Sequence, residues 1–180
     1  MPPIRETPEY ALITAFYGDR RARRSQVRYL VHIDQGLTVL TAIGASEAAH
    51  RAYALHPLVQ GDEDLAANFD ALTRAAPTLH PHALGLAMEY RSVANAFLSP
   101  MEDHPGYDDP ARIRLSPLPE VNQMLVADKV QNYQDFLHYH RDTHPRAAAL
   151  DRYFRAWLAR LEISDAQFAT LCPAPPEHLG

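Results

Sequence analysis

Residues 29–43 read YLVHIDQGLTVLTAI, and this stretch decides the fold class. On a helical wheel at about 100° per residue, its apolar side chains gather on one half. The members of that half are Leu30, Ile33, Leu37, Val39, Leu40 and Ile43. Asp34 and Thr38 take the opposite side, whereas His32 falls inside the apolar half. The stretch therefore predicts an amphipathic helix that stops at Gly44 and carries one polar side chain inward.

The same helical period recurs along the rest of the chain, and the alternation typical of strands is nearly absent. Further helices are expected at 7–23, 46–60, 62–76, 80–99, 119–140, 145–161 and 164–171. A loop rich in Pro, Asp and Gly is expected at 100–117. The sequence thus predicts an all-α fold, with seven to eight helices around one core in a single domain over residues 1–180.

Composition excludes several classes of protein. The chain of 180 residues is 47% hydrophobic and 22% charged, which is typical of a folded protein rather than a disordered one. A net charge of −5 gives no strong nucleic-acid signal, and the basic run RRARR at 20–24 is local. The single cysteine, Cys172, rules out a disulfide within the chain and a zinc site built of cysteines. Neither a signal peptide nor a membrane-spanning run is recognised, so a cytoplasmic location is expected.

Two more of the predicted helices carry polar side chains on their apolar faces. In 46–60, His56 falls in the middle of the face that includes Tyr53. In 119–140, Asp128 continues the stripe that begins with apolar residues, and Asn132 follows it on the same face. A buried carboxylate is costly when it has no partner. Something must therefore lie opposite Asp128.

Two histidines and one aspartate thus point inward from three separate helices. Imidazole and carboxylate together suit a divalent transition metal. An inward histidine is also commonly a hydrogen-bonded core residue, and an inward aspartate a salt-bridge partner. Convergence in space cannot be seen in a sequence, so both interpretations remain open at this point.

Three segments carry more specific local patterns. They are residues 17–44, YGDRRARRSQVRYLVHIDQGLTVLTAIG; residues 51–65, RAYALHPLVQGDEDL; and residues 124–136, MLVADKVQNYQDF. In this order they resemble the hydrolase domain of Rel/SpoT stringent-response enzymes, in the HD superfamily of metal-dependent phosphohydrolases. The resemblance covers about residues 10–140 and leaves 141–180 as a C-terminal helical extension. It implies an HD-type helical domain.

The resemblance also implies roles for individual residues. It implies that His32, His56 and Asp128 are the ligands of a divalent metal ion, which could be Mn, Fe, Zn, Co or Mg. It implies that a nucleotide is bound by four residues: Arg23, Arg24, Ser25 and Asn132. Lys129 follows Asp128 but points about 100° away from it on the helix.

The chain departs from the family pattern at Pro57, which stands where the superfamily has its naming aspartate. Gln60 and Gly61 stand where the Rel/SpoT subset has a catalytic Glu-Asp pair. Pro57 is also expected to kink or end its helix, because it leaves the carbonyl of Tyr53 without its usual partner.

Two alternatives fit this departure. In the first, the acids of GDEDL re-enter the site, and Asp62 or Asp64 supplies a fourth ligand or the base that activates water. With Gln60, these are the candidate catalytic residues. In the second, the site is degenerate and binds no metal, and Asp62, Glu63 and Asp64 are simply the acidic first turn of the next helix.

The function expected from these patterns is metal-dependent hydrolysis of a phosphate ester or anhydride in a nucleotide. The alternative is a catalytically inactive HD-like module that binds a nucleotide or a protein partner. The amphipathic stretch 145–161 is expected to close the core or to form the face of a homo-oligomer. No membrane partner is expected.

Overall fold

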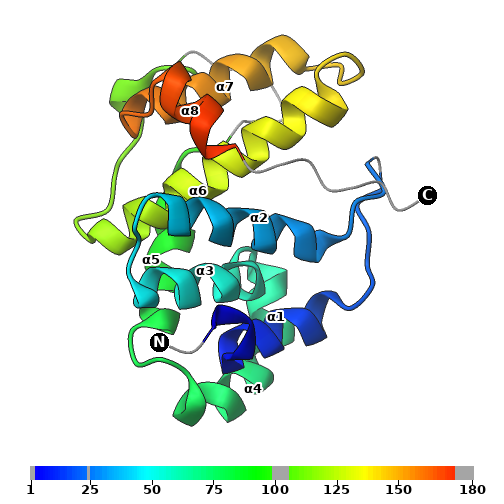
Figure 1. Cartoon of the computed structure of the whole chain (residues 1–180), viewed down its shortest axis with the longest axis vertical. Coiled ribbons are helices and arrows are strands. Elements are labelled where there is room, and N and C mark those ends of the chain that lie inside the picture. The colour runs from blue at the N-terminus through cyan, green and yellow to red at the C-terminus, as the bar shows by residue number, and fades with distance from the viewer. Residues whose placement is uncertain (1–2, 24, 99–105, 173–180) are drawn as a thin grey trace.

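Eight α helices and no strand make up the regular structure of the residues that the computed structural model describes, which are 3–23, 25–98 and 106–172 (Figure 1). The helices are α1 Pro8–Tyr17, α2 Tyr29–Ala42, α3 Glu47–Val59, α4 Asp62–Ala75, α5 Ala83–Ala96, α6 Pro119–Asp135, α7 Ala147–Arg160 and α8 Asp165–Leu171. A π-helical turn, Phe136–His140, continues α6, and 3-10 turns lie at Ile4–Glu6, Ala76–Thr78 and Pro110–Arg112. The prediction of an all-α fold is confirmed.

Local side-chain and backbone chemistry explains where α1 begins and ends. The Thr7 side chain caps α1 by accepting a hydrogen bond from the Tyr10 amide, as serine and threonine caps do. Gly18, with φ of 52°, then ends α1 at Tyr17, because only glycine adopts such a conformation without cost. The expected helix over 7–23 was therefore too long.

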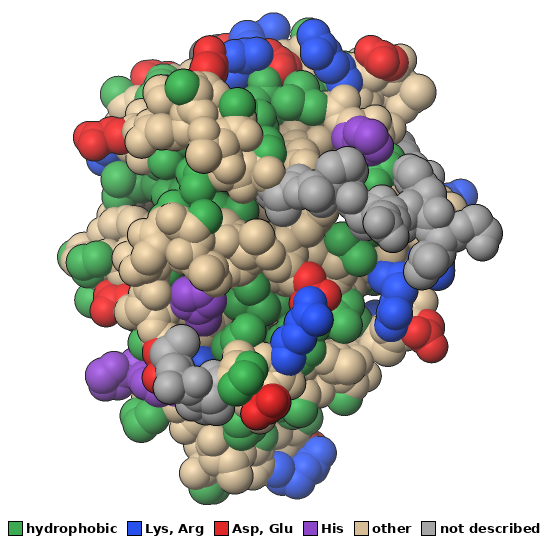
Figure 2. Space-filling view, viewed as in Figure 1, with side chains coloured by type: hydrophobic (Ala, Val, Ile, Leu, Met, Phe, Trp, Pro, Cys, Tyr) green, Lys and Arg blue, Asp and Glu red, His purple; other side chains and the backbone are tan. Residues whose placement is uncertain are grey.

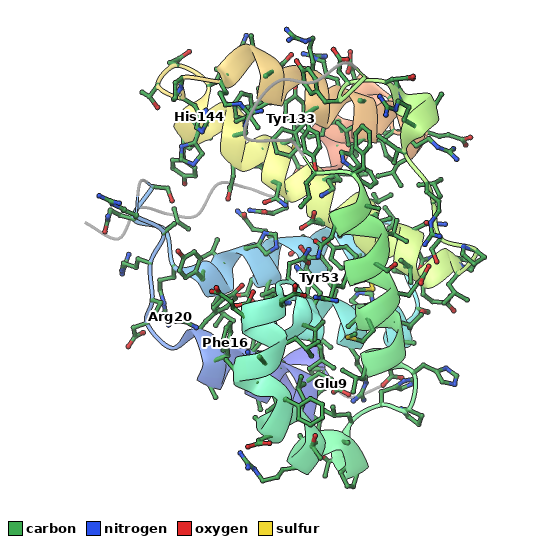
Figure 3. The ribbon with its side chains drawn as sticks, turned by 180° about the vertical axis from the view of Figure 1, so that it is seen from behind. Glu9, Phe16, Arg20, Tyr53, Tyr133 and His144 are labelled. Carbon is green, nitrogen blue, oxygen red and sulfur yellow. The ribbon has the colours of Figure 1, made fainter. Side chains whose placement is uncertain are left out.

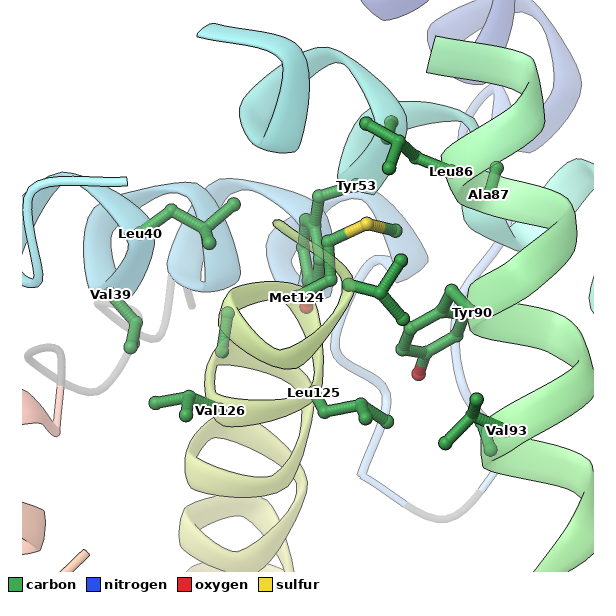
Figure 4. Packing of buried hydrophobic residues seen from close by; sticks show 14 of the residues in the cluster. Val39, Leu40, Tyr53, Leu86, Ala87, Tyr90, Val93, Met124, Leu125 and Val126 are labelled. Atoms are coloured by element: carbon green, nitrogen blue, oxygen red, sulfur yellow. The ribbon is translucent and has the colours of Figure 1, made fainter. Parts of the chain in front are cut away.

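The helix that carries His56 lies in the middle of the fold. Helix α3 packs against α1, α2, α4, α5 and α6 (Figure 1). Helices α7 and α8 lie on the other side of α6 from α1 and α4 (Figure 1). Figure 4 shows Tyr53, Met124 and Tyr90, from α3, α6 and α5, meeting in the core. All three are buried, and α2 also packs against both α3 and α6, so the three helices that carry the candidate ligands are in mutual contact.

Pro57 lies in the last turn of α3, which ends two residues later at Val59. The helix thus runs through Pro57 and ends within one turn of it, and Gln60, with φ of −63° and ψ of −52°, still has helical dihedral angles. Side chains of neighbouring helices satisfy carbonyls at this end: the Asn68 amide donates to the Leu58 carbonyl at 3.4 Å, and the Asn95 amide donates to the Gln60 carbonyl at 2.8 Å. The helix end is thus held by α4 and α5.

Charged side chains of both signs are interspersed over the face shown in Figure 2. This distribution accords with the modest net charge of −5. Among residues 3–23, 25–98 and 106–172, no helix has the length and apolar character needed to cross a membrane.

One acid is fully buried away from the candidate site. Glu9, labelled in Figure 3, accepts hydrogen bonds from the Arg51 guanidinium at 2.9 Å and from the His80 amide at 2.6 Å. Arg51 also pairs with Glu47, whose side chain is 35% exposed. Glu9 therefore ties α1 to α3 and to the segment that leads into α5.

We expect Glu9→Gln to lower the free energy of unfolding by about 2 kcal/mol, because it leaves a largely buried guanidinium with only one carboxylate. Glu47→Gln is the matched control, since it removes the exposed partner of the same Arg51 and should cost about 0.5 kcal/mol. Urea denaturation of both variants measures the difference. Equal losses would show that the burial of Glu9 contributes nothing.

Candidate metal centre

His32, His56 and Asp128, on α2, α3 and α6, come together in the folded chain. Each offers one ligand atom, and these atoms lie within 4.8 Å of one another. The His32 Nε2 and Asp128 Oδ1 atoms are 3.6 Å apart. Ligands to one ion lie at about 2 Å from it, so small side-chain shifts would close the three atoms around a metal. The prediction that these three side chains meet is confirmed.

In both imidazoles, Nδ1 is hydrogen-bonded to an oxygen that can only accept. His32 Nδ1 donates to the Gln131 side-chain oxygen, and the Gln131 amide donates in turn to Gln35 Oε1 at 3.1 Å. His56 Nδ1 lies 2.7 Å from the Tyr53 carbonyl, which can only accept, so this nitrogen carries the proton. In a neutral ring, a proton on Nδ1 leaves the lone pair on Nε2, which is the nitrogen a metal would bind. In His32 this nitrogen lies 3.6 Å from Asp128 Oδ1 and 3.4 Å from the Tyr53 hydroxyl.

The protonation states also suit a cation. Burial, aided by the neighbouring His32, lowers the pKa of His56 from 6.5 to about 4 and keeps the ring neutral. Burial alone would raise the pKa of Asp128, but the Lys129 ammonium and the two imidazoles bring it down to about 2. Near neutral pH the site presents a neutral His56 ring beside an ionised carboxylate.

The ammonium of Lys129 lies closer to Asp128 than the direction of its backbone position on the helix indicates. Although its backbone position faces away from Asp128, its long side chain turns back, and its ammonium lies 2.8 Å from Asp128 Oδ2. The ammonium also lies 4.9 Å from the centre of the Trp157 ring, in a cation–π contact. Both charges are buried. Asn132 donates to the other carboxylate oxygen at 2.8 Å, so Asp128 is held firmly in place.

A cavity of about 610 Å³ opens above the three candidate ligands. Its wall includes Phe16, Tyr17 and Tyr29, and the last two rings are stacked with centroids 5.4 Å apart. The Arg20 guanidinium, also in the lining, lies 4.5 Å from the centre of the Phe16 ring (Figure 3). One rim of the cavity thus combines aromatic rings with a guanidinium.

The other predicted site residues divide between the cavity and its surroundings. Those that line the cavity are Ser25, Gln60, Asp64 and Asn132. Arg23 is not among the lining residues, whereas Arg20, from the same basic run, is. Arg24 lies outside the residues that the structure describes.

The acids of GDEDL also separate from one another. Asp62 does not line the cavity; its side chain is 96% exposed and pairs with Arg91. Asp64 lines the cavity, and its carboxylate accepts the Gly61 amide at 3.1 Å at the start of α4. Of the two aspartates in this segment that were candidates for catalysis, only Asp64 is in position to face a ligand.

No protein-family model, curated protein or solved structure matches this chain. Two nitrogen lone pairs and one ionised carboxylate form a donor set suited to zinc, manganese, iron or cobalt. A set of three such side chains would leave coordination positions open, as catalytic metal sites do.

The low pKa of His56 predicts an acid-dependent loss of stability in the metal-free protein. The unfolded chain binds a proton at His56 below pH 6.5, whereas the folded chain resists it until about pH 4. The free energy of unfolding should therefore fall by about 3 kcal/mol as the pH drops between these values. Denaturation as a function of pH measures this slope. His56→Gln should flatten it, and parallel curves for the two proteins would contradict the assignment.

Proposed function

We propose that the cavity hydrolyses a phosphate ester or anhydride bond of a nucleotide, with a divalent metal held by His32, His56 and Asp128. The observation that carries the proposal is the hydrogen bonding and ionisation of these three side chains. Both imidazoles have Nδ1 committed to an acceptor, and the carboxylate between them is ionised. The order of these residues in the chain, which resembles that of HD-type phosphohydrolases, supports it.

Other residues that line the cavity are suited to bind the substrate and to accept a proton in this reaction. A divalent ion, when bound, supplies Lewis-acid activation of water and of the phosphoryl oxygen. Arg20 is positioned to pair with a phosphate group, and the stacked Tyr17 and Tyr29 offer a surface for a nucleobase. Asp64 is the carboxylate that can accept a proton from the attacking water, whereas the amide of Gln60 cannot act as a base.

The test is turnover of a panel of nucleotides by the purified protein, with Mn²⁺, Fe²⁺, Zn²⁺, Co²⁺ or Mg²⁺ added separately. We expect phosphate release that depends on the metal. Arg20→Ala should raise KM about tenfold or more, because it removes a phosphate contact made by the substrate. Arg23→Ala is the matched control and should leave KM unchanged. Absence of turnover with every metal and nucleotide would overturn the proposal.

A second candidate is an HD-like module that binds a nucleotide or a protein without catalysis. The observation that favours it is the pairing of Asp128 with Lys129 and Asn132, which already satisfies both carboxylate oxygens without an ion. Pro57, in place of the family's aspartate, points the same way. Calorimetry of nucleotide binding in the presence of a chelator separates the two candidates, because only the inactive module should bind equally well without metal.

A further inference from the structure

The backbone at Pro57 has one consequence for the ring of His56. In an α helix, the amide of residue 57 would donate to the carbonyl of Tyr53, four residues earlier, but proline has no amide proton to give. The Tyr53 carbonyl is nevertheless satisfied, because it accepts from His56 Nδ1 at 2.7 Å. The hydrogen bond that the helix loses at Pro57 is thus replaced by one from the neighbouring imidazole.

This replacement determines what His56 can do. A proton held on Nδ1 by a carbonyl leaves Nε2 as the only nitrogen able to bind a cation. The His56 ring also contacts two tyrosine rings, Tyr53 at 4.6 Å and Tyr90 at 4.9 Å between ring centroids. Pro57 itself is buried and borders the same cavity.

We propose that Pro57 is a positioning residue, which prepares His56 for metal binding by withholding a backbone amide from the Tyr53 carbonyl. The inference rests on the proposed function in taking the three side chains as a metal site. It gives the proline a role in place of the carboxylate that the HD pattern would put there. The site then works with three protein ligands, one of them oriented by the backbone.

Tyr53 contacts both candidate histidine ligands. Its carbonyl holds His56, and its hydroxyl lies 3.4 Å from His32 Nε2. A change in the backbone at Tyr53 would therefore reach both imidazoles. Gln131 holds His32 independently of Pro57, so the loss of the proline should disturb His56 first.

The test is Pro57→Ala, which restores the amide proton and lets it compete for the Tyr53 carbonyl. Nitrogen-15 NMR of the metal-free protein reports which nitrogen of His56 is protonated. We expect wild-type His56 to hold its proton on Nδ1, and Pro57→Ala to shift part of the population to Nε2. Zn²⁺ affinity, measured by competition with a chelating dye, should fall 10- to 100-fold, the usual effect of losing a group that orients a ligand.

Two further proteins separate the amide from other effects of the substitution. Pro119→Ala removes an exposed proline from the first turn of α6, where no helix hydrogen bond is lost, and should leave both readouts unchanged. An alanine-like residue joined through a backbone ester at position 57 lacks the amide proton, as proline does, and should restore the wild-type tautomer and Zn²⁺ affinity. Circular dichroism checks that each variant is folded.

The outcomes distinguish this inference from the proposed function. An unchanged His56 tautomer and unchanged Zn²⁺ affinity in folded Pro57→Ala would overturn the role of the proline, whatever the protein hydrolyses. A shifted tautomer with weakened Zn²⁺ binding supports the role even if no nucleotide is turned over. Failure of the ester variant to restore either readout would assign the effect to the ring of proline and would also overturn the inference.

Discussion

Replacing Asp128 by asparagine should abolish metal binding and destabilise the metal-free protein at the same time. The substitution removes the only charged ligand of the candidate centre, so affinity should fall by more than the roughly 100-fold seen when a supporting group is lost. It also leaves the buried ammonium of Lys129 without a counter-charge. Breaking a buried pair in this way costs about 3–5 kcal/mol. Calorimetric titration and urea denaturation measure the two effects.

The double variant Asp128→Asn with Lys129→Met separates the two roles. An apolar side chain in place of the lysine removes the uncompensated charge, so stability should recover by most of the amount lost. Metal affinity should not recover. Recovery of metal binding in the double variant would exclude Asp128 as a ligand, and Lys129→Met alone reports any effect of the lysine on the ion.

Gly36→Ala should lower the free energy of unfolding by about 4 kcal/mol, beyond the usual cost of an overpacked core. Gly36 lies in α2, where the ring and hydroxyl of Tyr53 fill the place that a β-carbon would take. Tyr53 is fully buried and cannot move aside without disturbing both histidines. A glycine in the middle of a helix is therefore required here by a neighbouring side chain.

Gly85→Ala is the matched control, because it makes the same change in another helix, α5, where nothing lies within 4 Å of the added carbon. There the better helix propensity of alanine should raise stability by about 0.5–1 kcal/mol. Thermal and urea denaturation of the two variants should thus give shifts of opposite sign. A stabilising effect at both positions would contradict the packing of Tyr53 against α2.

The helical period of the sequence was sufficient for the fold class and for the inward direction of the three candidate ligands, but not for their convergence. His32, His56 and Asp128 each lie on an otherwise apolar face, and burial of those faces against a common core brings them together. The helical pattern did not predict where α1 ends. Gly18 lies inside the stretch expected to be helical, and its positive φ reflects the local path of the chain.

The surroundings of the site were less predictable, because they depend on side-chain reach. Lys129 has a long flexible side chain, so its backbone direction did not reveal its pairing with Asp128. A buried aspartate followed by lysine was the available signal. Arg20 and Arg23 differ in no local pattern, and only the path of the loop after α1 decides which of them borders the cavity. Asp62 and Asp64 share a helical turn but face different surroundings.

The buried carboxylate of Glu9 also bears on the cavity wall. Glu9 fixes the first turn of α1, while Phe16 and Tyr17 at the last turn form part of the cavity wall. Helix α1 therefore joins a buried ion pair at its first turn to the aromatic part of the cavity wall at its last turn. Loss of this ion pair in Glu9→Gln should therefore raise amide hydrogen exchange throughout α1, as far as Phe16 and Tyr17.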